Sequence, residues 1–75
     1  INLGLGEPAF ATAPEIVDAA LIALETEPLG YTFNGGILEL RELIAQRAPG
    51  NHTADSVCVT VGANGGLLGS MLVSV

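Results

Sequence analysis

The chain has 75 residues, of which 49% are hydrophobic and only 13% are charged, and its formal net charge is −6 at pH 7. Arg41 and Arg47 are its only strong bases, which argues against nucleic acid and anionic membranes as partners, because both are bound through clusters of Lys and Arg. A single cysteine, Cys58, and a single histidine, His52, leave no means of building an internal disulfide or a multi-ligand protein metal site.

The apolar content predicts that something outside these residues covers much of their surface. We expect the cover to be the remainder of a larger chain or a second subunit, and the absence of an initiating Met fits a fragment. The alternative is an unusually apolar small protein. No charged-then-apolar leader opens the sequence, and the apolar run 67–75 is far shorter than the ~20 residues that span a bilayer, so the expected compartment is the cytoplasm.

The first part of the chain predicts an extended segment and then a helix. Residues 1–6 alternate apolar residues with Asn and Gly, and a Glu-Pro turn at 7–8 ends this segment. Thr12 and Glu15 have the spacing of a capping box, and Pro14 lies where a helix has no donor to lose. These signals predict an amphipathic helix over about 13–25.

The middle of the chain predicts a second helix between two loops. Residues 31–36 read as an extended link that ends in two glycines, and apolar residues then recur at steps of three and four over 37–48. Pro49 and Gly50 end this pattern, and a polar loop follows over 51–56.

The last part of the chain predicts a strand, a glycine turn and a helix. Residues 57–61 are an unbroken apolar and β-branched run, typical of a strand buried on both faces of a parallel sheet. This interpretation makes Cys58 a small core residue and not a nucleophile. Glycine-rich residues 62–66 form the expected turn, and residues 67–75 have helical spacing.

The glycine turn is the best functional candidate that the residues alone offer. A strand that feeds through Gly62–Gly66 into a helix presents free backbone amides at the positive end of the helix dipole, where a phosphate dianion binds well. Asn64 would add a donor or cap the helix. The alternative is a tight turn that only packs a helix on a strand. The turn is not a P-loop, because the chain has no lysine.

Other motifs have simpler interpretations. A dinucleotide fingerprint over 4–9 is excluded because it must open a helix, which Pro8 prevents. His52 is interpreted as a solvated loop residue. The glycosylation triplet 51–53 is interpreted as accidental.

Three segments taken together, in this order and spacing, resemble the class I and II aminotransferases of the aspartate aminotransferase superfamily. They are Leu3–Phe10, Tyr31–Arg41 and Val59–Leu67, and the match covers essentially the whole chain. The sequence departs from the family pattern at Ala9, where aspartate is common, and at Gly35, where alanine is common. Arg41 resembles a recurrent Leu-Arg position with a structural role in anchoring the helix, and a surface or interface ion pair is its simpler interpretation.

The resemblance implies an α/β fold and an incomplete one. The chain would be an N-terminal fragment of a fold-type I aminotransferase, with an extended segment and two helices followed by the first strand-turn-helix of the large parallel-sheet domain. Residues 1–30 would be the N-terminal segment and first helix, and residues 31–75 the start of the cofactor-binding domain.

The resemblance also implies the site residues. Gly62, Ala63 and Asn64 resemble positions that bind the phosphate of pyridoxal 5'-phosphate. Tyr31 resembles a tyrosine that reaches the phosphate of the neighbouring subunit in a homodimer, and Gly6 a residue whose backbone meets the substrate α-carboxylate.

The expected function is transfer of an amino group between an amino acid and a 2-oxo acid, with no catalytic residue inside the chain. The family's chemistry needs a lysine that bonds covalently to the cofactor and an aspartate at its pyridine nitrogen. With no lysine, the 75 residues alone are expected to be inactive. The alternatives are a small phosphate-binding module and a non-catalytic remnant, and the substrate amino acid stays open.

Overall fold

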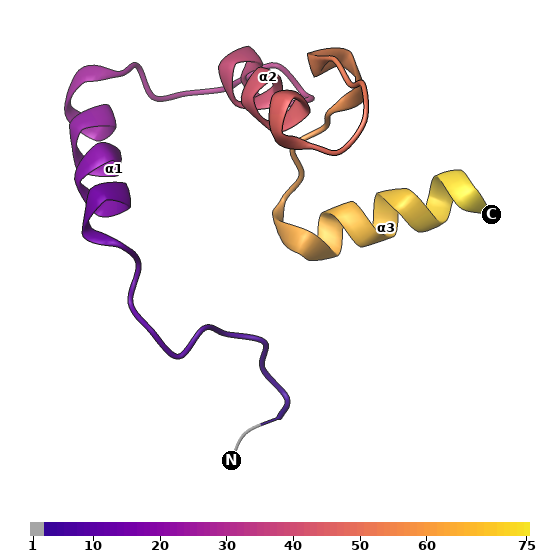
Figure 1. Ribbon diagram of the computed structural model, residues 1–75, viewed down its shortest axis with the longest axis horizontal. Helices are drawn as coiled ribbons and strands as arrows, with labels where there is room; N and C mark the ends of the chain where they lie inside the picture. Colours follow the sequence, from indigo (N-terminus) through magenta and orange to yellow (C-terminus); the bar gives the residue numbers. More distant parts are fainter. Residues whose placement is uncertain (1–2) are drawn as a thin grey trace. The chain divides into compact units, whose positions relative to one another are not determined.

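The computed structural model describes residues 3–75, so the first two residues of the predicted extended segment lie outside the described part. Its helices are α1 (Pro14–Thr26), α2 (Leu38–Arg47), the 3-10 helix η1 (Ala54–Ser56) and α3 (Gly62–Ser74), drawn in chain order in Figure 1. The chain divides into two compact units, one up to Gly30 and one from Tyr31 onward. Within residues 3–75, no helix has the length and apolarity needed to cross a membrane.

The predicted first helix is confirmed as α1, but its predicted cap is wrong. The helix begins at Pro14, whose missing N–H costs nothing in the first turn, and its N-cap is Ala13. Thr12 therefore lies one residue too early to cap, and no side chain among residues 3–75 caps this helix. The helix ends where Glu27 turns extended (φ −99°, ψ 146°), as expected for a residue that precedes a proline.

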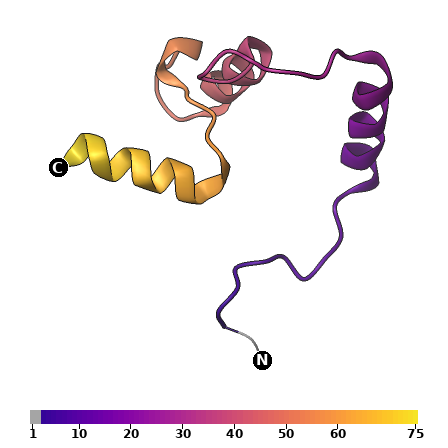
Figure 2. The same cartoon turned by 180° about the vertical axis from the view of Figure 1, so that it is seen from behind.

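The predicted second helix is confirmed as α2, and it carries the buried residues of its unit. Ile37 and Ala48 flank it with extended backbone, and Ala48 precedes the proline that stops the helix. Arg41 and Ala45 are the buried residues among those described, and both lie on α2. The two views agree that η1 lies beside α2, and residues of the two elements are in contact (Figures 1 and 2).

The predicted parallel-sheet strand over 57–61 is wrong, and with it the α/β assignment, because residues 3–75 contain helices and no strand. The backbone is extended at Val57 (φ −113°, ψ 130°), as the β-branched residues favour. A strand also needs a continuous ladder to a neighbouring strand, and here the segment makes a single backbone bond to another segment, from Val59 N–H to Gly35 O at 2.8 Å. The burial expected on both faces is absent as well, since Val61 is 96% exposed and Cys58 is exposed rather than a core residue.

Helix α3 begins five residues earlier than the sequence analysis placed it. Gly62 opens the helix with φ +67°, a left-handed conformation that favours glycine, and the remaining glycines of the predicted turn are helical. The expected turn is thus compressed into one residue. α3 has no buried residue, and Ser70 and Ser74 donate side-chain hydrogen bonds to the carbonyls of Gly66 and Ser70.

Candidate functional site

The N-terminus of α3 is the part of the chain whose backbone is best placed to hold an anion. The first amides of a helix have no acceptor within the helix, and no side chain among residues 3–75 caps those of α3. A Cβ placed on Gly62 would meet nothing within 4 Å, so the approach to this residue is open. The first turn carries no acidic side chain, so no carboxylate on it opposes an anion at the positive end of the helix dipole.

Thr60 shapes this helix start, a role that was not predicted from the sequence. Its Oγ1 donates a hydrogen bond of 2.9 Å to the carbonyl of Gly62. A Cβ on Gly66 would lie 3.3 Å from the same Oγ1, and one on Gly65 would lie 3.4 Å from Thr60 Cβ. The hydroxyl therefore sits against the glycines of the first turn. A Thr two residues before the first glycine was the sequence signal for this role.

The predicted cofactor-binding residues all fall in the unit that starts at Tyr31. Gly62, Ala63 and Asn64 are consecutive in the first turn of α3, and all three are exposed. Tyr31 is the first residue of the same unit, and its side chain is fully exposed. Their roles toward a cofactor stay predictions.

Gly6, the predicted substrate-binding residue, lies in the other unit. It is exposed in the segment that precedes α1, and a Cβ on it would meet nothing within 4 Å. Its backbone is therefore open to a ligand, and its role toward a substrate also stays a prediction.

Arg41 has the structural role that the sequence analysis weighed, and its contacts are to carbonyls rather than to an acid. Only 9% of the residue is exposed. Its Nε donates to the carbonyl of Gly36 at 3.0 Å, and a terminal guanidinium nitrogen donates to the carbonyl of Ala54 at 3.1 Å. The guanidinium carbon lies 5.3 Å from the centre of the Phe33 ring, within the range of a cation–π contact.

The turn at Gly36 is closely matched to the segment that leads into α3. Gly36 has φ +102°, and a Cβ on it would lie 2.6 Å from Val59 Cγ2, so any side chain there would clash. Gly36 N–H closes the turn by donating to Phe33 O at 2.8 Å. The predicted loop glycine is therefore required by both conformation and space.

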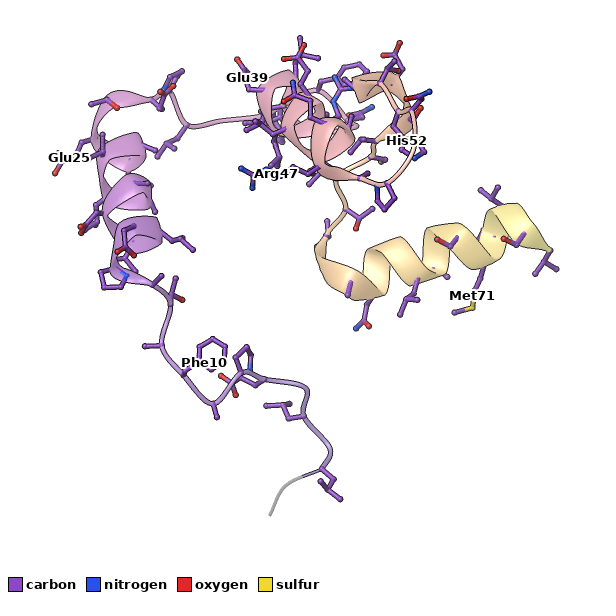
Figure 3. All side chains as sticks on the ribbon, in the orientation of Figure 1. Phe10, Glu25, Glu39, Arg47, His52 and Met71 are labelled. Atoms are coloured by element: carbon purple, nitrogen blue, oxygen red, sulfur yellow. The ribbon has the colours of Figure 1, made fainter. Side chains whose placement is uncertain are left out.

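The loop after α2 lines an open depression. The depression has a volume of about 340 Å³ and is lined by polar side chains that include Glu42, His52 and Asp55. His52 is exposed, as expected from the sequence, and its Nε2 lies 2.9 Å from Pro49 O; Figure 3 labels it beside the loop between α2 and η1. Among residues 3–75, no group of three or more His, Cys, Asp or Glu side chains is placed to hold a metal ion.

Comparison with known proteins identifies the family. A probable aspartate aminotransferase of Methanocaldococcus jannaschii is 40% identical over 76 aligned residues, which cover 96% of this chain and 20% of that protein. The chain belongs to the aspartate-aminotransferase-type family. An aspartate aminotransferase of Thermotoga maritima is 38% identical over the same share of each chain. An aromatic-amino-acid aminotransferase of Thermococcus litoralis is 39% identical over 85% of this chain and 18% of its own.

This aminotransferase-family chain spans about a fifth of the length of the curated relatives that it matches. No protein-family model matches it, and no solved structure matches it significantly. The family resemblance drawn from the three segments is confirmed by these relatives. They carry different substrate names, so family membership does not specify an amino acid for this chain.

Proposed function

We propose that these residues are part of a pyridoxal-phosphate-dependent aminotransferase that transfers an amino group between an amino acid and a 2-oxo acid. The observation that carries the proposal is the 40% identity to a probable aspartate aminotransferase over 96% of the chain. The longer protein that would contain residues 1–75 is called the full enzyme below. Its lysine and pyridine-binding aspartate would come from other parts of its sequence, because the 75 residues contain no lysine.

The start of α3 fits the phosphate group of this cofactor. Its first amides lack helical acceptors, its opening residue Gly62 is unobstructed, and its first turn has no carboxylate. The whole of α3 lacks charged side chains, so the attraction would come from the backbone dipole and hydrogen bonds. These features support the assignment of Gly62, Ala63 and Asn64 to the phosphate.

Each remaining candidate has a separate role in the proposal. The backbone of Gly6 would hold the substrate α-carboxylate, and Tyr31, fully exposed, would reach the cofactor phosphate of the neighbouring subunit of a homodimer. The bound cofactor would supply the electron sink for chemistry at the substrate Cα. The candidate residues of this chain would bind and orient the substrate and the cofactor. Proton transfer at the substrate Cα would be carried out by the lysine in another part of the full enzyme.

The test begins with the coding sequence beyond the codon for Val75. We expect it to continue for several hundred residues and to encode both a lysine and an aspartate in strand and turn contexts. The purified full enzyme should then convert a 2-oxo acid to its amino acid at the expense of a second amino acid, measured across a panel of amino donors. A stop codon directly after Val75 would contradict the proposal and leave a phosphate-binding module or a remnant.

A further inference from the structure

Arg41 joins two separate segments of its unit to α2. Through Nε it holds the carbonyl of Gly36, in the turn before the helix, and through a terminal nitrogen it holds the carbonyl of Ala54, in η1 after the helix. Its guanidinium carbon lies over the Phe33 ring, 5.3 Å from the ring centre. A residue that is nine-tenths buried and bonded to both flanking loops fixes where those loops lie relative to the helix.

The turn that Arg41 holds is also joined directly to the segment that follows η1. Val59 N–H donates to Gly35 O at 2.8 Å, and the Val59 side chain occupies the space that a Cβ on Gly36 would need. Val59 lies three residues before Gly62, where α3 begins. The turn that Arg41 anchors therefore sets the course of the backbone into the predicted phosphate site.

The same turn lies close in sequence to the second predicted phosphate residue. Tyr31 precedes Phe33 by two residues, and Phe33 both closes the turn through its carbonyl and contacts the Arg41 guanidinium. A disturbance of the turn would reach Tyr31 and Gly62 together. In a homodimer these two residues would serve the phosphates of different subunits.

We infer that Arg41 is a positioning residue that fixes the backbone at both predicted phosphate-binding places, Tyr31 and the start of α3. It acts through the turn 33–36 and the Val59–Gly35 hydrogen bond. This inference rests on the proposed function for the ligand, whereas the anchoring itself rests on the contacts above. Lysine cannot replace arginine here, because one ammonium cannot reproduce a planar fork that donates to two carbonyls and lies over a ring.

The experiment compares Arg41→Lys with the matched control Arg47→Lys in the full enzyme. Arg47 lies on the same helix and is exposed, so its replacement should change nothing. Dissociation constants are measured for pyridoxal phosphate and for pyridoxal, which lacks the phosphate. Arg41→Lys should raise the dissociation constant of pyridoxal phosphate by roughly tenfold and leave that of pyridoxal unchanged. If Arg41 had a purely structural role, Arg41→Lys would weaken the binding of both ligands equally or of neither. Either result would overturn the inference.

Amide hydrogen exchange over residues 57–61 provides the readout that does not depend on the ligand. Exchange there should accelerate about tenfold in Arg41→Lys and stay unchanged in Arg47→Lys. Unchanged exchange in Arg41→Lys would overturn the anchoring role. If the unsubstituted enzyme bound pyridoxal phosphate no more tightly than pyridoxal, the proposed phosphate site would be wrong. The exchange result would still show whether Arg41 anchors the segment 57–61.

Discussion

Helices α2 and α3 differ in burial, and the more apolar helix is the less buried of the two. α3 has no charged side chain, yet none of its residues is buried, and its large apolar side chains are all more than half exposed. α2 carries four charged residues and contains both of the buried ones, Arg41 and Ala45. The segments that flank α2 are thus fixed by a guanidinium with two carbonyl partners. The apolar side chains of α3, in contrast, have no surface within residues 3–75 that buries them.

The most severe test of this comparison is the stability of the 75 residues alone. Only Ala45 forms a buried hydrophobic core among the described residues, which is far too little to offset the conformational entropy of folding. We expect the isolated chain to bind a hydrophobic dye and to show no heat-absorption peak in calorimetry, as a molten or aggregated species does. A sharp, cooperative unfolding transition from a monomer would contradict this expectation.

The next largest effect is expected from Gly36→Ala in the full enzyme. The new side chain would adopt a strained φ of +102° and meet Val59 Cγ2 at 2.6 Å. Together these should lower the free energy of unfolding by about 2–4 kcal/mol. Chemical denaturation measures the loss, and Gly30→Ala is the control, because a Cβ on Gly30 would meet nothing within 4 Å. Equal losses in the two variants would show that the turn at Gly36 is not tightly packed.

The sequence predicted local elements well, because their signals are local. Proline and the residue before it define both ends of α1 and the end of α2, and these positions can be read directly from the chain. The strand over 57–61 was wrong for a physical reason: β-branched residues favour extended backbone, but a sheet depends on a neighbour that periodicity cannot supply.

The local backbone geometry of the candidate site was predictable in part for the same reason. Glycines before a helical pattern indicate an open helix start, and Gly62 does take a positive φ there. The anchoring by Arg41 was not readable from spacing, because its carbonyl partners lie five and thirteen residues away, in the turn before α2 and in η1 after it. Backbone acceptors leave no trace in residue identity, so only the structure shows them.

A smaller effect is expected from Gly69→Ala, which tests whether α3 is limited by its own sequence. Gly69 is helical, has no positive φ, and a Cβ on it would meet nothing within 4 Å. Alanine should stabilise the helix by about 0.5–1 kcal/mol. Far-UV circular dichroism of the isolated chain should show increased helix content, and Gly30→Ala, outside the helices, should show no increase. A fall in helix content would mean that the residue 69 backbone is not helical in solution.

An effect of similar size is expected from the aromatic contact of Arg41. Phe33→Leu removes the ring from beneath the guanidinium, and because Phe33 is 70% exposed its cation–π contact is expected to contribute only about 0.5–1 kcal/mol. Phe10→Leu makes the same chemical change in the other unit, at a ring that is 82% exposed. In the full enzyme, amide exchange over residues 33–36 should rise in Phe33→Leu and not in Phe10→Leu. Unchanged exchange in Phe33→Leu would show that the turn is held without the ring contact, by hydrogen bonds such as that from Arg41 Nε to the Gly36 carbonyl.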